Sequence, residues 1–139
     1  MKREAEMIDS TILVADDEEI VRRLLERVLK APDRHIMAFS DGDSVLGAAR
    51  ECRPSLIILD LCMPGMSGSA ACQALRTDPR TRHIPILAMS GRAATKAETD
   101  TLCVGADDVL MKPFDINELR SRVENILLQS AAFAQPQAA

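Results

Sequence analysis

The sequence has very little aromatic character. Its 139 residues include no Trp, no Tyr and only three Phe, so the chain lacks the flat side chains on which single-stranded nucleic acids stack. The 17 Lys and Arg are outnumbered by 21 Asp and Glu, which gives a net charge of −4, and no basic block occurs. Because binding to a phosphate backbone depends on clustered cations, we expect no direct contact with nucleic acid.

Paired cysteine motifs and long apolar runs are also missing. Cys52, Cys62, Cys72 and Cys103 form no C-x-x-C motif and have no paired histidine spacing, which argues against a zinc site or a redox motif. No apolar run approaches the ~18 residues of a membrane span, and no signal peptide is evident. We therefore predict a cytoplasmic protein with reduced thiols and no membrane contact.

What is present suits one globular domain. Hydrophobic residues make up 47% of the chain and charged residues 27%, which is enough for a substantial core in a single domain of this length. We predict a flexible lead-in over residues 1–10, an ordered domain over 11–128, and a tail or the start of a linker over 129–139.

Five short apolar segments have the composition of buried strands. In Leu56–Asp60, Ile and Leu fill the run, Pro54 precedes it and Pro64-Gly65 turn the chain after it. The other predicted strands are Ile12–Ala15, His35–Phe39, Ile86–Met89 and Val109–Met111.

Segments with helical spacing follow each predicted strand. They are Glu18–Lys30, Gly42 to about Cys52, Gly68–Thr77, Thr95–Val104 and Ile116–Leu127. The fourth carries little apolar surface, so we expect it to be the least firmly anchored. The alternation predicts an α/β fold: a doubly wound, five-stranded parallel sheet with five helices and right-handed crossovers.

Polar side chains end four of the predicted strands. Asp16 and Asp17 follow the first strand, Asp60 ends the third, Ser90 follows the fourth and Lys112 follows the fifth. The carboxyl ends of parallel strands lie along one edge, where ligands bind. Three neighbouring carboxylates need a counter-ion, and hard oxygen ligands suit Mg²⁺ or Mn²⁺. With the metal bound, Asp60 can attack phosphorus and form an aspartyl phosphate, whose oxygens Lys112 and Ser90 can contact.

Each of these residues has a plainer interpretation when it is taken alone. The Asp pair can cap a helix, Asp60 and Ser90 can belong to turns, and Lys112 can be a solvated charge. Four separate strand ends rarely supply this combination by capping and solvation alone, so the conjunction favours a site for phosphoryl transfer.

With these residues in place, the sequence closely resembles the receiver domain of bacterial response regulators in two-component signalling. The resemblance runs from about Thr11 to Leu128 and implies the flavodoxin-like strand order 2-1-3-4-5. The matching motifs are Val14-Ala15-Asp16-Asp17-Glu18, Leu59-Asp60-Leu61-Cys62-Met63-Pro64-Gly65-Met66-Ser67-Gly68, Met89-Ser90-Gly91, Gly105-Ala106-Asp107-Asp108 and Met111-Lys112-Pro113-Phe114.

The resemblance also implies roles for individual residues. Asp60 would accept a phosphoryl group from a histidine kinase or a phosphotransfer protein. The metal ligands would be Asp16, Asp17, Asp60 and the backbone carbonyl of Cys62. Ser90 would be the switch hydroxyl and Lys112 the phosphoryl-contacting lysine, with a cis peptide bond between Lys112 and Pro113.

A receiver domain implies partners rather than a catalysed reaction on a substrate. Such a domain promotes only its own phosphorylation and slow dephosphorylation, so we do not expect an enzyme in the ordinary sense. The expected partners are the phosphodonor and a downstream protein or a missing output domain. A homodimer through the last two helices is possible in this family.

The chain departs from the family's pattern at two places. Val109 stands where Tyr or Phe is common, three residues before the lysine, so an aromatic switch is not available. We expect the response to pass instead through residues 90–95 and the weakly anchored fourth helix. Cys62 and Arg92 flank the expected path of the hydrolytic water and orient water poorly, so we expect a long-lived phosphoryl group.

Two other functions stay open from the sequence. Hydrolases of the haloacid dehalogenase type also use an Asp nucleophile at a strand end with Mg²⁺. They carry a second Asp two residues later, where this chain has Cys62. The remaining alternative is a degenerate receiver that acts only as a protein-binding module.

Overall fold

Five parallel strands form one sheet at the centre of the molecule. The computed structural model describes residues 10–91 and 105–134, with residues 130–134 described by their backbone alone. The strands are β1 (Ser10–Ala15), β2 (Arg34–Phe39), β3 (Leu56–Asp60), β4 (Ile86–Ser90) and β5 (Asp108–Met111). Their order is β2-β1-β3-β4-β5, which confirms the predicted sheet.

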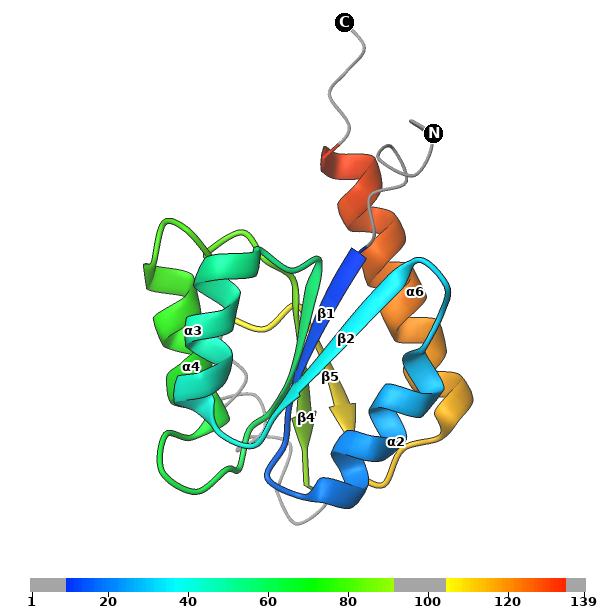
Figure 1. The fold of residues 1–139 in the computed structure, drawn as a ribbon, viewed down its shortest axis with the longest axis horizontal. Helices are drawn as coiled ribbons and strands as arrows, with labels where there is room; N and C mark the ends of the chain where they lie inside the picture. The colour runs from blue at the N-terminus through cyan, green and yellow to red at the C-terminus, as the bar shows by residue number, and fades with distance from the viewer. Residues whose placement is uncertain (1–9, 92–104, 135–139) are drawn as a thin grey trace, which may run out of the picture.

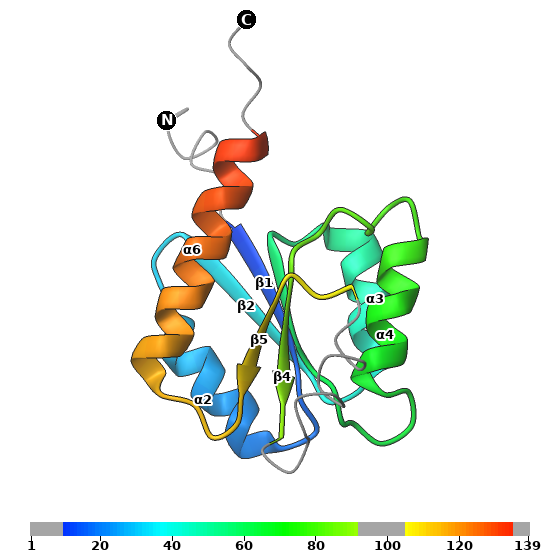
Figure 2. The same ribbon diagram turned by 180° about the vertical axis from the view of Figure 1, so that it is seen from behind.

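Helices cover both faces of this sheet. They are α2 (Glu19–Leu29), α3 (Gly42–Cys52), α4 (Gly68–Thr77) and α6 (Ile116–Ala134). Figures 1 and 2 show α2 and α6 together on one face and α3 and α4 on the other. The fourth predicted helix, over residues 95–104, lies outside the described residues.

The core is divided by the sheet into two layers, because successive strand residues point to opposite faces. Ile12, Val14 and Ile58 pack in the layer that contains α2 and α6. Leu13 and Ile57 belong to the layer of α3 and α4. The inner parts of the central strands are therefore apolar on both faces, as a sheet covered on both faces requires.

Side-chain caps fix the beginning of two helices on the α3 and α4 face. The carboxylate of Asp41 accepts a hydrogen bond from the Ser44 amide at 2.8 Å. The Ser67 hydroxyl accepts one from the Ala70 amide at 3.1 Å. These bonds satisfy amides that have no partner within the helix.

The end of the last helix was predicted too early. The sequence pattern ended it at Leu127 and assigned a tail from Gln129, but α6 continues through Ala134. Alanine has the highest helix propensity and dominates Ser130-Ala131-Ala132-Phe133-Ala134. In Figures 1 and 2 the last turns of α6 extend past the amino ends of the strands, away from the sheet. Of the described helices, none has the length and apolar content needed to cross a membrane.

The end of α3 contains an unfavourable backbone conformation. Arg53 follows the helix with φ 48° and ψ 66°, a left-handed conformation that costs a non-glycine L-residue roughly 1–2 kcal/mol. Its side chain is exposed, and its amide donates to the Ala49 carbonyl at 3.2 Å. The strain therefore comes from the Cβ atom, while the guanidinium makes no hydrogen bond or ion pair with the described residues.

Replacing Arg53 with Gly is expected to stabilise the protein by about 0.5–1 kcal/mol, because glycine adopts this conformation without the Cβ penalty. Urea unfolding followed by far-UV circular dichroism measures the difference. Arg53→Ala keeps the Cβ atom and should give no comparable gain. Equal stabilities for Arg53→Gly and Arg53→Ala would show that the backbone conformation is not the cause.

Candidate functional site

The strands bring the predicted site residues to one edge of the sheet. Asp60 is the last residue of β3 and Ser90 the last of β4, and the register pairs Asp60 with Met89 and Ser90 with Met111. Lys112 directly follows β5. The strand ends are thus level with one another, and the polar groups meet at the carboxyl edge, where ligands bind in sheets of this kind.

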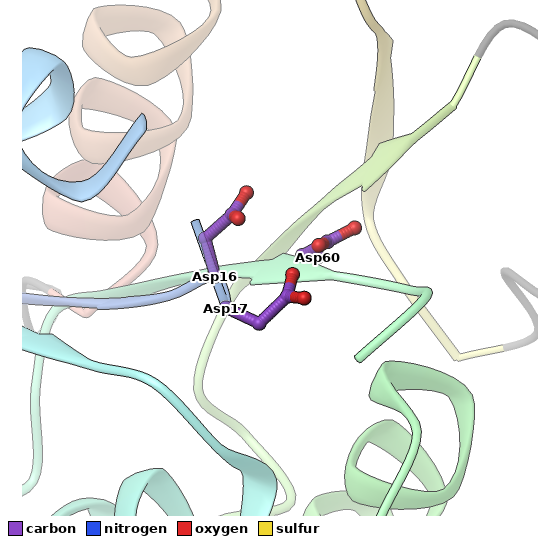
Figure 3. A group of neighbouring side chains, drawn as sticks. All are labelled: Asp16, Asp17 and Asp60. Carbon is purple, nitrogen blue, oxygen red and sulfur yellow. The ribbon is translucent and has the colours of Figure 1, made fainter. Parts of the chain in front are cut away.

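Three carboxylates form the centre of this site. Asp16, Asp17 and Asp60 each offer an oxygen, and these atoms lie within 4.8 Å of one another. Figure 3 shows the three side chains extending from the ends of β1 and β3 toward the same space. Adjacent ligand oxygens of an octahedral Mg²⁺ lie about 3 Å apart and opposite ones about 4 Å. The donor set and its spacing therefore fit one such ion after small side-chain adjustments.

Asp16 is completely buried and is held at every polar atom. Its amide donates to the Phe39 carbonyl at 3.1 Å, and its carbonyl accepts from Arg22 Nη1 at 2.8 Å. Oδ1 accepts from the Glu18 amide at 2.9 Å, and Oδ2 from Lys112 Nζ at 2.7 Å. The residue is consequently fixed before any ligand arrives.

Lys112 is the cation of the site. Besides its bond to Asp16, Nζ lies 3.5 Å from Asp60 Oδ2 and 3.8 Å from Glu18 Oε1. Burial alone would lower the pKa of Lys112, but the hydrogen bond to Asp16 and the charges of Asp16, Asp60 and Glu18 outweigh it, and the pKa is raised. The ammonium group therefore stays charged and partly offsets the repulsion among the carboxylates. The peptide bond that follows, to Pro113, is cis as predicted.

The pKa of Asp60 is the most strongly shifted in the site. Burial raises its pKa to about 6, and the charges of Asp16 and Asp17 act in the same direction. The Cys62 amide, which donates to Oδ1 at 3.2 Å, and the Lys112 ammonium oppose this shift without cancelling it. A carboxyl poised in this way is typical of functional sites.

Close contact between α4 and β3 sets the backbone around Asp60. The Gly68 amide donates to the Leu61 carbonyl at 3.1 Å. A Cβ atom on Gly68 would lie 1.9 Å from the Asp60 carbonyl oxygen and 2.6 Å from Leu61 Cα. Only glycine allows the start of α4 to approach the end of β3 so closely.

The remaining predicted residues lie around this centre. Ser90 is buried, and its hydroxyl donates to the Gly91 carbonyl at 3.5 Å. Cys62 is exposed and its backbone adjoins Asp60, so the proposed role of its carbonyl stays a prediction. Val109 packs against the small cluster of Leu61 and Ala88. Arg92 and most of the segment expected to respond lie outside the described residues.

One residue at this site, Arg22, was not predicted from the sequence. Arg22 binds the Asp16 carbonyl from α2, but it resembles any polar residue on the exposed face of an amphipathic helix. Arg23 beside it has the same side chain and points to solvent, where it pairs with Glu19 at 2.8 Å. The distance along the sequence from Asp16-Asp17 could have suggested that an arginine of this helix contacts the site. It could not have shown whether Arg22 or Arg23 makes the contact.

Comparison with known proteins agrees with this geometry. The profile of the response regulator receiver domain matches residues 12–124. Response regulator PleD of Caulobacter vibrioides is 38% identical over 119 residues, which make up 86% of this chain and 26% of PleD. Histidine kinase P4 of Formosa agariphila is 36% identical over 118 residues, 85% of this chain and 8% of that protein. The chain thus spans about a quarter of one relative and less than a tenth of the other.

A solved structure shows the same fold. Chemotaxis protein CheY4 of Vibrio cholerae superposes with a TM-score of 0.76 and is 27% identical in sequence. The match covers 85% of this chain and 98% of that one. The flavodoxin-like arrangement that the resemblance implied is therefore confirmed.

Replacing Asp60 with Asn should stabilise the metal-free protein at pH 7.5 by roughly 1–3 kcal/mol. A carboxyl whose pKa is raised by folding destabilises the native state when it is ionised, above about pH 6. The penalty shrinks as the pH falls from the folded pKa toward the unfolded value of 3.8. Urea unfolding at pH 7.5 and pH 4.5, in the presence of a chelator, should show the advantage of Asp60→Asn declining. Glu51→Gln removes an exposed carboxylate near the end of α3, so its effect on stability should not decline in this way between pH 7.5 and pH 4.5. The same decline in both variants would show that the raised pKa of Asp60 is not the cause.

Gly68→Ala should destabilise the protein by roughly 2–3 kcal/mol, because the added methyl group clashes with the backbone at Asp60. Gly47→Ala is the matched control. That glycine lies inside α3, and a Cβ atom there meets nothing within 4 Å, so we expect a gain of about 0.5–1 kcal/mol. Both values follow from urea unfolding monitored by circular dichroism. Effects of the same sign in both variants would contradict the steric explanation.

Proposed function

Because this chain belongs to the family of response regulator receiver domains, we propose that it is a signalling switch controlled by phosphorylation of Asp60. One observation carries the proposal. Lys112 Nζ lies 2.7 Å from Asp16 and 3.5 Å from Asp60, so the nucleophile, the acidic pair and a cation converge where a phosphoryl group would be received. Phosphoryl transfer depends mainly on such positioning and charge neutralisation.

The chain's own residues would perform the transfer as follows. An Asp60 carboxylate oxygen attacks phosphorus, the new oxygen–phosphorus bond forms, and the bond from phosphorus to the donor's histidine nitrogen breaks. The departing imidazole takes a proton from solvent. Lys112 moves from Asp16 toward the phosphoryl oxygens, and the Ser90 hydroxyl donates to another. Mg²⁺ or Mn²⁺, held by Asp16, Asp17, Asp60 and the Cys62 carbonyl, would supply the remaining charge neutralisation.

An apolar groove beside Lys112 offers a docking place for the phosphodonor. It is lined by Val21, Leu24, Lys112, Pro113 and Phe114. Ile20, which lies next to Val21 on α2, is 81% exposed and adds apolar surface that a partner could cover. A histidine kinase or phosphotransfer protein bound here would bring its phosphohistidine directly to Asp60.

The output is carried by another protein or another domain. Receiver domains act with histidine kinases and with output domains, and both curated relatives are much longer than the matched region. We propose that phosphorylation alters the binding of such a partner. The response through residues 90–95 and the homodimer through the last two helices stay predictions, since most of that segment and one of those helices lie outside the described residues.

The hydrolase alternative has less support than the switch. Family membership favours a receiver, and Cys62 provides no carboxyl group to act as the acid and base of a hydrolase. The degenerate receiver has no observation in its favour, because the acidic, hydroxyl and lysine positions are all occupied by the required residue types.

Intact-mass measurement after incubation with acetyl phosphate tests the proposal. Wild-type protein with Mg²⁺ should gain one phosphoryl group, and the gain should disappear in Asp60→Asn or with excess chelator. Asp43→Asn, which removes an exposed carboxyl from the start of α3, should leave labelling intact. Continuous turnover of phosphomonoesters would favour the hydrolase. Absence of labelling in the wild type would favour the degenerate receiver.

A further inference from the structure

The two neighbouring acids at the end of β1 are constrained very differently. Asp16 is buried and bonded through its amide, its carbonyl and both carboxylate oxygens. Asp17 is exposed, and its carboxylate makes no hydrogen bond or ion pair with a described residue. The direction of the Asp17 side chain therefore depends on the backbone that carries it.

That backbone is held from α2 by Arg22. Nη1 of Arg22 donates a hydrogen bond of 2.8 Å to the carbonyl oxygen of Asp16. The carbonyl belongs to the peptide group that joins Asp16 to Asp17. Because a peptide group is planar and rigid, fixing its oxygen also fixes the direction in which the chain enters Asp17.

The first turn of α2 keeps Arg22 in position for this bond. The Arg22 amide donates to the Glu18 carbonyl at 3.1 Å, and the Glu18 amide donates to Asp16 Oδ1. A closed set of bonds thus links Asp16, Glu18 and Arg22. Metal ligands commonly depend on such supporting contacts for their orientation.

We propose that Arg22 is a positioning residue for the metal site, and that its bond to the Asp16 carbonyl sets the orientation from which the Asp17 carboxylate reaches the ion. The inference rests on the proposed function, since it assumes that Mg²⁺ binds between Asp16, Asp17 and Asp60. Arg22 itself touches neither the ion nor the phosphoryl group. Its loss should weaken metal binding although all three carboxylate side chains are still present.

Removing a positive charge from α2 would by itself change the Mg²⁺ affinity. A control that removes the same charge but not the hydrogen bond is therefore required. Arg23 provides it, because this side chain is 76% exposed and pairs with Glu19 on the solvent side of the same helix. Arg22→Met and Arg23→Met remove the same charge from adjacent positions. Only the first removes the bond to Asp16.

Calorimetric titration of the full chain with Mg²⁺ is the test. The sequence has no Trp or Tyr whose fluorescence could report Mg²⁺ binding. We expect Arg22→Met to weaken Mg²⁺ affinity about tenfold, within the range found for residues that support metal ligands. Arg23→Met should stay within about twofold of wild type. Arg22→Lys, which keeps the charge and one donor, should give an intermediate affinity, and it replaces Arg22→Met in the comparison if that variant fails to fold.

The outcomes separate this inference from the proposed function. Urea unfolding of the same proteins in chelator shows whether Arg22 only stabilises the fold. Lower stability of Arg22→Met with unchanged Mg²⁺ affinity would overturn the positioning role, as would equal losses of affinity in Arg22→Met and Arg23→Met. If wild type binds no Mg²⁺, or Asp17→Asn binds it as well as wild type does, the proposed metal site itself is wrong.

Discussion

The repulsion among Asp16, Asp17 and Asp60 is the constraint on which the arrangement of this site depends. Three carboxylates with oxygens within 4.8 Å of one another cannot all stay ionised in a partly buried site without compensating charge. The protein supplies one ammonium group, from Lys112, and places it against Asp16 and Asp60. One cation leaves the site short of positive charge, and the charges of Asp16 and Asp17 add to the effect of burial, which is the main cause of the raised pKa of Asp60. In the proposed function, the same deficit favours the binding of a small divalent cation.

The fold can maintain such a site because the apolar layers on both sides of the sheet keep the strand ends fixed. Ile57, Ile58 and Leu59 are fully buried and hold β3 between two packed layers. The charged edge is therefore supported by a core whose stability does not depend on the charges. Gly68 then lets α4 approach the end of β3 without a clash at Asp60. The apolar layers stabilise the fold, whereas the repulsion among the carboxylates at the sheet edge opposes folding. Because these contributions come from different parts of the molecule, the fold can tolerate unfavourable residues at this edge.

Sequence reasoning succeeded where one local pattern determines the result. The run Leu56–Asp60 could only be a strand covered on both faces, and polar residues at successive strand ends had to meet because parallel strands share an edge. It failed where the result depends on tertiary contacts or on small differences in free energy. The alanine-rich end of α6 has no apolar stripe to reveal it, and Arg53 takes a left-handed conformation before a proline, where the sequence gives no warning. Arg22 differs from Arg23 only in the direction it faces on the folded helix.

The charges of the site also explain how a switch can work without an aromatic residue at position 109. In the proposed function, the two positive charges of Mg²⁺ balance the net charge of three carboxylates and one ammonium group. A phosphoryl group on Asp60 then restores an excess of negative charge and adds three strong acceptor oxygens. Lys112, which is bonded to Asp16, can direct another of its N–H groups to one of these oxygens, and the Ser90 hydroxyl is the neighbouring donor on the next strand. The phosphoryl oxygens need hydrogen-bond donors, so they would attract the Ser90 hydroxyl whichever side chain stands at position 109 in β5. Val109, packed on Leu61 and Ala88, removes one way of transmitting that change but leaves its cause intact.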